Sequence, residues 1–267
     1  MLRNPAVAGQ FYPGTSDALR RTMEELIPFG KQQRKAIGIV SPHAGYIYSG
    51  AIAGKTFSQI SIPRRVVILG PNHHGHGASG GVFPSGSWLT PLGSVPIDPE
   101  LTADILENCP GLSGDEASHR FEHSLEVQVP FIQTLAPEAS IVPICLSSLP
   151  LVDLLLLGTS LGDVLSRYPG ETLMVASSDM THFEPGETAR AKDMLALERV
   201  LEIDSEGLYR VVRGRGISMC GVIPVVVMLA AAKVLGARLG TLVQYGNSGD
   251  VTGDQSDVVG YAGVIIE

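Results

Sequence analysis

Residues 36–46 read AIGIVSPHAGY, a short apolar run followed directly by a turn that carries His43. The same arrangement recurs at residues 66–74, VVILGPNHH, where the turn carries His73. A short apolar run closed by turn residues is typical of a parallel strand that is covered on both faces. The sequence therefore predicts two buried strands, at 36–40 and 66–70, each ending in a histidine loop.

Strand and helix signals alternate along the rest of the chain. Residues 140–146 and 172–176 repeat the buried-strand pattern, and the leucine-rich stretch 151–166 between them has the length of a helix. Further elements are expected as helices at 16–27, 99–107, 124–135, 187–201 and 222–235, a hairpin within 81–97, and strands at 241–245 and 258–266. Such alternation predicts an α/β fold: a single three-layer domain with a largely parallel central sheet, spanning residues 1–267.

Composition excludes several classes of protein. The 267 residues are 44% hydrophobic and 17% charged, which argues against a disordered chain or a coiled coil. The net charge of −8 disfavours nucleic acid and anionic membrane surfaces as partners. The longest apolar stretch, 220–234, is shorter than the roughly 20 residues that span a bilayer. With three widely spaced cysteines and no visible export signal, we expect a cytoplasmic protein without a disulfide framework.

Histidines collect after the predicted strands. Open α/β sheets bind ligands at the carboxyl ends of their strands, and neutral imidazole is the commonest metal ligand in proteins. We expect His43 and His73 to bind a metal together with a carboxylate or thiolate, although any single histidine could be an ordinary loop residue. His74 and His76 are expected to orient the loop or to face solvent, and His74 is also a candidate to lie beside the metal ligands or the substrate.

Asp179 and His182 follow the strand predicted at 172–176 and are three residues apart. If a helical turn begins there, they share a face: the carboxylate then fixes the imidazole or joins the metal, and the imidazole acts as general base. The alternative is that Asp179 caps a helix. His123 and Glu126 have the same spacing, and capping, burial or a place beside the metal ligands or substrate all remain open for them.

Cys220 opens the apolar stretch, and a helix amino terminus lowers the pKa of a thiol. The alternative is a core cysteine that packs as a small hydrophobic residue. Cys109 and Cys145 have no such setting and are interpreted as structural.

Several familiar motifs are missing. GAIAGKT at 50–56 is one residue short of a phosphate-binding loop and is interpreted as helix packing. The sequence contains no dinucleotide-binding G-x-G-x-x-G that opens a βαβ unit, no H-E-x-x-H and no G-x-S-x-G around Ser177. Nicotinamide chemistry, zincin proteolysis and α/β-hydrolase activity therefore lose support.

Eight motifs in order resemble the Memo family over nearly the whole chain. They are AGQFYP (8–13), SPHAGY (41–46), GPNHH (70–74), WLTPLG (88–93), EHSLE (122–126), SSDMTH (177–182), CG (220–221) and YGNSGD (245–250). The resemblance implies the fold of class III extradiol dioxygenases, which bind non-heme Fe(II) through two histidines and a glutamate. Carried over by motif, it implies His43, His73 and Cys220 as metal ligands, with Asp179 and His182 in the pocket.

A cysteine in place of the carboxylate ligand is a departure from that pattern. A thiolate is softer and more easily oxidised, so copper or zinc compete with Fe(II) as the expected ion. One hypothesis is an oxidoreductase for a small aromatic or phenolic substrate, with His182 removing the substrate proton. The other is a module that stores metal or binds a peptide. The resemblance is compatible with both, since animal members are linked to motility and phosphotyrosine peptides, and prokaryotic members to a radical-SAM protein.

Overall fold

The computed structural model describes residues 1–28, 33–170 and 172–267. Its helices are α1 (Ser16–Leu26), α2 (Tyr46–Phe57), α3 (Pro99–Asn108), α4 (Val129–Leu135), α5 (Leu151–Leu165), α6 (Gly186–Leu201), α7 (Ser205–Gly214), α8 (Val222–Val234), α9 (Gly249–Thr252) and the 3-10 turns η1 (Ala117–His119) and η2 (Glu126–Gln128). Its strands are β1 (Leu2–Arg3), β2 (Gly38–Ser41), β3 (Arg65–Pro71), β4 (Gly80–Val82), β5 (Ser87–Thr90), β6 (Gly93–Pro96), β7 (Ser113–Gly114), β8 (Ser140–Leu146), β9 (Thr172–Ser177), β10 (His182–Glu184), β11 (Gly240–Asn247) and β12 (Val258–Ile266).

The central sheet has the order β10-β12-β2-β9-β3-β8-β4-β7, with β11 paired to the other side of β12. The inner strands β2, β9, β3 and β8 run parallel, whereas β12 and β4 flank them antiparallel. The sheet is therefore largely parallel, as the sequence predicts. The carboxyl ends of its parallel strands, and the loops that follow them, all lie at one edge of the sheet.

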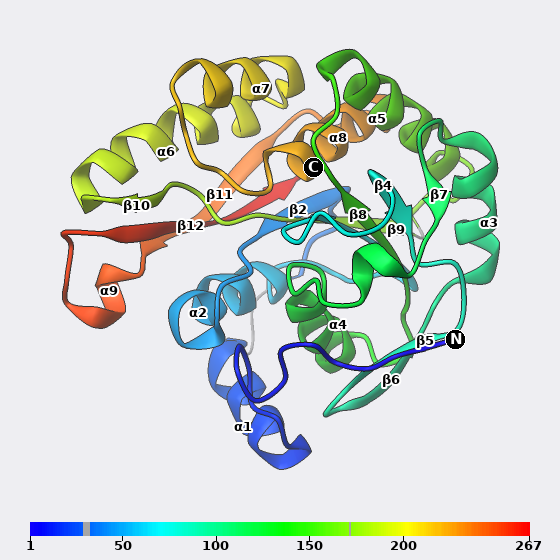
Figure 1. Cartoon of the computed structure of the whole chain (residues 1–267), viewed down its shortest axis with the longest axis horizontal. Helices are drawn as coiled ribbons and strands as arrows, with labels where there is room; N and C mark the ends of the chain where they lie inside the picture. Colours follow the sequence, from blue (N-terminus) through cyan, green and yellow to red (C-terminus); the bar gives the residue numbers. More distant parts are fainter. Residues whose placement is uncertain (29–32, 171) are drawn as a thin grey trace.

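Helices cover both faces of the sheet and make three layers (Figure 1). Helices α3 and α5 to α8 pack on one face, and α1, α2 and α4 pack on the other. Side chains of β3 alternate between the two cores: Val67 and Leu69 face the first, Val66 and Ile68 the second. Burial on both faces explains why these strands read as unbroken apolar runs.

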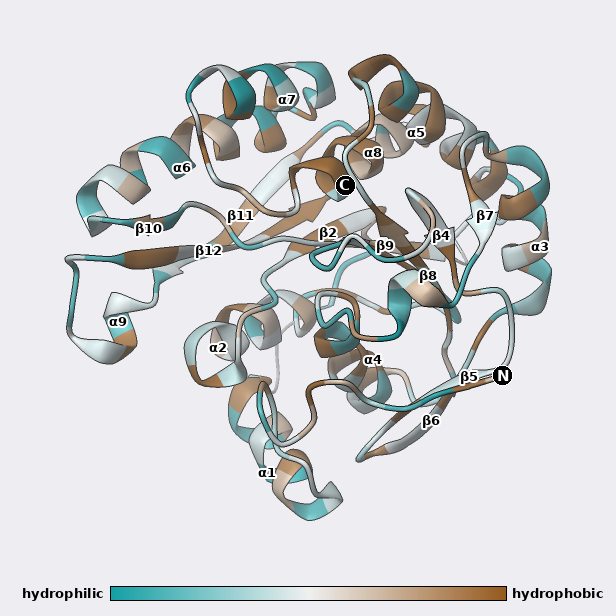
Figure 2. Cartoon of the chain, viewed as in Figure 1, coloured by the Kyte–Doolittle hydropathy of each residue, from teal (hydrophilic) through white to brown (hydrophobic). Residues whose placement is uncertain are grey.

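Helix α8 is the centre of the first core. Almost all its residues are buried, so it is coloured as hydrophobic along its length in Figure 2, whereas α6 and α7 carry a hydrophilic outer face. Gly158 and Gly162 of α5 allow α8 to approach closely, because a Cβ at either glycine would lie within 2.8 Å of α8 atoms. The α5–α8 contact therefore depends on small residues at these two positions.

Most predicted elements are confirmed, and two details differ, at residues 124–135 and at residues 179–182. The region 81–97 contains the antiparallel hairpin β5–β6. The helix expected at 124–135 is divided into η2 and α4, and residues 50–56 lie within α2. Residues 179–181 have no helical turn, so the expectation that Asp179 and His182 share a helix face, or that Asp179 caps a helix, is wrong.

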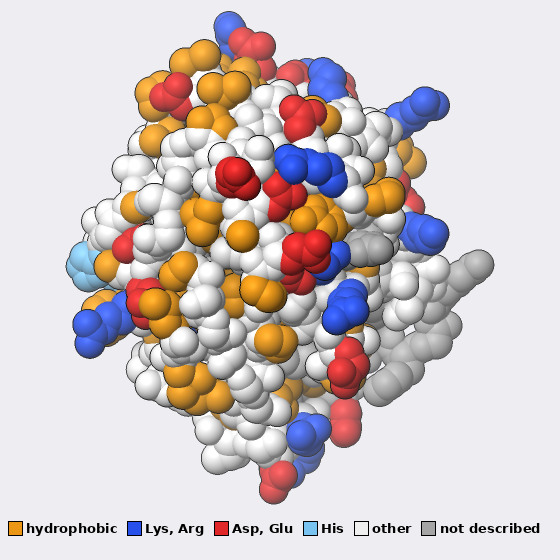
Figure 3. Space-filling model, turned by 90° about the vertical axis from the view of Figure 1, so that its right-hand side faces the viewer, with side chains coloured by type: hydrophobic (Ala, Val, Ile, Leu, Met, Phe, Trp, Pro, Cys, Tyr) orange, Lys and Arg blue, Asp and Glu red, His pale blue; other side chains and the backbone are white. Residues whose placement is uncertain are grey.

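The surface in Figure 3 carries acidic and basic side chains interspersed with apolar ones, without a broad patch of one sign. Of the described helices, none combines the length and the apolar character needed to cross a bilayer.

Candidate metal centre

Histidines from separate segments meet at the carboxyl edge of the parallel strands. His43 follows β2, His73 follows β3, and His123 lies in the segment before η2. One ligand nitrogen from each of these imidazoles lies within 4.8 Å of the other two. The rings of His73 and His123 are stacked with centroids 4.7 Å apart, and His43 meets both edge-on. This separation allows a single metal ion to contact all three imidazoles.

The tautomer of His43 follows from its hydrogen bonds. Its Nδ1 lies 3.0 Å from Oγ of Ser177, which donates its own proton to the carbonyl of Ser124 and accepts a hydrogen bond from the amide of Gln128. Because the Ser177 hydroxyl proton is already used, Nδ1 of His43 must donate to it. Nε2 of His43 therefore carries a lone pair, which faces Sγ of Cys220 at 3.2 Å.

His73 is oriented by a buried carboxylate. Oε1 of Glu122 accepts from Nδ1 of His73 at 2.8 Å, while Oε2 accepts from the His73 backbone N–H at 2.7 Å and Oε1 also accepts from the Ser124 N–H. These hydrogen bonds hold the pKa of Glu122 well below its ordinary value despite its burial. A carboxylate that fixes Nδ1–H and leaves Nε2 free is the usual support of a metal-binding histidine.

His123 completes the cluster from the side of the amino-terminal segment. Its ring packs against Phe11 with centroids 4.8 Å apart and lies near the Glu122 carboxylate, with Nδ1 3.5 Å from Oε1. Burial lowers the pKa of His123 to about 4 and lowers that of His43 well below its ordinary value. Both imidazoles are consequently neutral at pH 7, which is the form that binds metal ions.

Cys220 adds a sulfur beside His43. The residue is partly exposed, and its sulfur accepts a hydrogen bond from the Asp179 backbone N–H at 3.3 Å. Burial and the nearby Asp179 carboxylate raise the pKa of this thiol, contrary to the lowering expected from a helix amino terminus. The helix begins only at Val222, so its first amides do not dominate the thiol. In the metal-free protein Cys220 is a neutral thiol. Cys109 and Cys145 are buried in the two cores, as predicted.

Asp179 and His182 lie in the same region but have different hydrogen-bond partners. Oδ1 of Asp179 accepts from the His43 backbone N–H at 2.7 Å, and burial raises the pKa of Asp179 to about 6. Nδ1 of His182 lies 3.0 Å from the carbonyl of Ser218 and must donate to it, which leaves Nε2 of His182 as a proton acceptor. The carbonyl of Ser218, and not Asp179, therefore sets the His182 tautomer.

Glu126 and His74 lie around the histidine cluster and are not part of it. The fully buried Glu126 carboxylate accepts hydrogen bonds from the Tyr12 hydroxyl and from two backbone amides of the amino-terminal segment, and it pairs with Arg3 at 2.7 Å. It therefore anchors that segment. His74 and His76 are exposed and stack on each other in the loop that follows His73.

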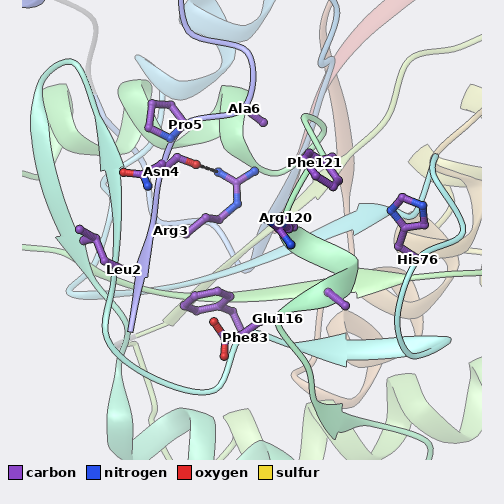
Figure 4. A pocket seen from close by; sticks show the side chains of 11 residues that line it. Leu2, Arg3, Asn4, Pro5, Ala6, His76, Phe83, Glu116, Arg120 and Phe121 are labelled. Carbon is purple, nitrogen blue, oxygen red and sulfur yellow. Dashed lines mark hydrogen bonds between the residues drawn. The ribbon is translucent and has the colours of Figure 1, made fainter.

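A cleft of about 790 Å³ lies beside the loop that carries His73. Figure 4 shows Arg3, Phe83, Arg120 and Phe121 around it, with His76 at one side. Arg3 joins the cleft to the histidine cluster, because its guanidinium donates to the carbonyl of Glu122, whose carboxylate holds His73.

Sequence reasoning missed the proximity of His123 to His43 and His73, and the supporting contacts of Glu122 and Ser177. The EHSLE motif carried the signal for His123 and Glu122, because Glu122 directly precedes His123 in it. Ser177 occupies the last position of β9, next to β2, which could have indicated a partner for His43.

Comparison with known proteins matches this chain to one family. The family model described as Memo-like protein covers residues 3–265. A MEMO1 family protein of Aquifex aeolicus is 45% identical over 266 residues, covering 99% of this chain and 98% of its own length. Another, from Methanopyrus kandleri, is 40% identical over 279 residues and covers 99% of both chains.

A solved structure supports the fold. The crystal structure of an uncharacterized protein from Escherichia coli K12 superposes with a TM-score of 0.57 at 14% identity, covering 87% of this chain and all of that one. At this identity the likeness concerns the fold alone.

Proposed function

Because this chain belongs to the Memo family, we propose that it is a metal-binding protein whose ion is held by His43, His73 and His123, with Cys220 beside them. The observation that carries the proposal is the direction of the imidazole lone pairs. Ser177 accepts a hydrogen bond from Nδ1 of His43, and Glu122 accepts one from Nδ1 of His73. Both Nε2 atoms are therefore free to bind an ion.

Fe(II) is the proposed ion, with copper and zinc as competitors. Imidazole nitrogen suits all three metals, and a thiolate favours the softer ones. On metal binding, Cys220 would lose its proton and act as an additional ligand 3.2 Å from Nε2 of His43. Asp179 would support the site through the His43 backbone.

The test is anaerobic loading with Fe(II), Cu(I) or Zn(II) followed by metal analysis of the purified protein. We expect one ion per chain, and loss of at least nine-tenths of it in His43→Ala and in His73→Ala. His123→Ala and Cys220→Ser then show which of these side chains binds the ion. Metal content unchanged by both His43→Ala and His73→Ala would overturn the proposal.

We further propose oxidoreductase activity on a small aromatic or phenolic substrate, with iron supplying the redox chemistry. Nε2 of His182 would accept the proton of a substrate hydroxyl, since its Nδ1 proton is committed to Ser218. Oxygen uptake by the Fe(II)-loaded protein against a panel of catechols tests this. We expect His182→Ala to lower uptake about 100-fold or more with the metal retained; equal uptake would contradict the assignment.

A second candidate is a metal carrier without turnover, or a peptide-binding module that uses the same pocket. The position of the Cys220 thiol favours the metal carrier, because a cysteine sulfur beside the imidazole of His43 adds a soft donor suited to holding copper or zinc. Tight one-to-one binding of Cu(I) together with no oxygen uptake on any catechol would support the carrier over the enzyme.

A further inference from the structure

Phe183 has an unusual backbone conformation next to the candidate site. Its φ is +58°, in the left-handed region that aromatic residues seldom adopt. It stands at a bulge: in the pairing of β10 with β12, His182 lies opposite Val259 and Glu184 opposite Val258, which leaves Phe183 without a partner. Bulges of this kind redirect a side chain and are frequent beside active sites.

Burial of the Phe183 side chain does not offset the cost of this backbone conformation. Phe183 is 75% exposed, so its ring contributes little to either core. Ile203 gives the comparison, because it also has a positive φ, +56°, but is only 5% exposed and packs in the core near α7. The strain at Ile203 is offset by burial of its side chain, whereas the strain at Phe183 is not.

The ring of Phe183 lies beside a side chain of the site. Its centroid is 5.7 Å from that of His182, in an edge-on arrangement. His182 is itself held by two contacts with Ser218, whose carbonyl and hydroxyl bind the imidazole and the backbone N–H. The bulge therefore places an exposed aromatic ring next to a fixed imidazole. The partner of that imidazole, Ser218, is two residues before the ligand candidate Cys220 in the sequence.

We propose that Phe183 is a ligand-contact residue: its ring packs on the planar apolar part of a molecule that binds the metal through oxygen atoms. The inference rests on the proposed metal site and adds the class of ligand. An exposed, strained aromatic residue is retained at a cost in stability, and contact with a bound planar group supplies the reason.

The experiment uses the full chain loaded with Co(II), whose absorption bands report ligand binding. Benzohydroxamate and acetohydroxamate carry the same metal-binding oxygens and differ in the aromatic ring. We expect the parent protein to bind benzohydroxamate about tenfold more tightly, and Phe183→Ala to remove that preference while leaving acetohydroxamate affinity unchanged. Leu239→Ala is the control and should keep the preference, because Leu239 is also an exposed apolar residue and lies beside Glu267, at the opposite end of the sheet.

Two outcomes separate this inference from the metal site itself. If the parent protein takes up no Co(II), the metal site is wrong and the inference is overturned with it. If Co(II) binds and Phe183→Ala keeps the preference for benzohydroxamate, only the role of Phe183 is overturned.

Thermal unfolding gives an independent readout. Phe183→Gly should raise the melting temperature by about 2 to 4 °C, because glycine adopts a positive φ without strain. Ile203→Gly should lower it, since that side chain is buried. A melting temperature lowered by Phe183→Gly as much as by Ile203→Gly would make Phe183 a structural residue and overturn the inference.

Discussion

The carboxylate of Glu122 is bound to His73 twice, through the ring Nδ1 at 2.8 Å and through the backbone N–H at 2.7 Å. Glu122→Gln keeps the shape but places an amide where three N–H donors need acceptors: the ring and the backbone of His73 and the backbone of Ser124. We expect metal affinity to fall about 10- to 100-fold, which a competition titration with a chromophoric chelator would measure. Glu116→Gln, which changes an exposed carboxylate of the neighbouring cleft, is the control. Equal losses in both variants would mean that only net charge matters.

Ser177 should control the orientation of His43. Ser177→Ala removes the acceptor of the Nδ1 proton, so the imidazole can change tautomer or rotate. We expect metal affinity to fall about tenfold with little change in the melting temperature. Ser41→Ala is the matched control, because the buried hydroxyl of Ser41 has no hydrogen-bond partner. If Ser177→Ala binds metal as tightly as the parent protein, the proposed orientation of His43 is wrong.

His119 should make stability depend on pH. It is fully buried between Phe83 and Trp88, and burial lowers its pKa to about 4. The unfolded chain, with a histidine pKa of about 6.5, binds more protons than the folded one between these values. The contribution of His119 to stability is therefore present above pH 6.5 and is lost as the pH falls towards 4, by about 3 kcal/mol.

Urea unfolding at pH 7 and at pH 4.5 measures this effect. His119→Phe loses the hydrogen bond to the Gly81 carbonyl at every pH, but it no longer titrates. We expect a smaller difference between the two pH values in this variant than in the parent protein. The same difference in both proteins would assign the pH dependence to other groups.

Arg3 should stabilise the fold through contacts that lysine cannot reproduce. Its guanidinium donates to the carbonyls of His119 and Glu122 and to the carboxylate of Glu126, and it lies 4.1 Å from the centre of the Trp88 ring. Arg3→Met leaves the Glu126 charge buried without its cation and should cost about 3 to 5 kcal/mol of unfolding free energy. Arg3→Lys should recover only part of this, because an ammonium lacks the planar fork. Full recovery by lysine in urea titrations would refute the role of the fork.

The sequence predicts the parts of this protein that depend on local pattern. The strands before His43 and His73 are unbroken apolar runs, so their positions and the meeting of their loops follow from hydropathy alone. The helical turn expected at Asp179 does not form, and the carboxylate instead accepts from the His43 backbone N–H, 136 residues away. Glu126 is similar: its partners come from the amino-terminal segment. Helix α7 was not predicted, although Leu208, Val211 and Val212 have helical spacing. Leu208 and Val212 are buried against α8 and its neighbours.

The contacts of Arg3 also constrain when the pocket can be completed during synthesis. Its partners His119, Glu122 and Glu126 follow it by 116 to 123 residues, and Cys220 follows His43 by 177. At roughly 5 to 20 residues per second, the guanidinium of Arg3 stays in water for several seconds before its acceptors leave the ribosome. The sulfur beside His43 arrives later still. The proposed metal site, with Cys220 beside His43, is therefore complete only after the segment around Cys220 has been made.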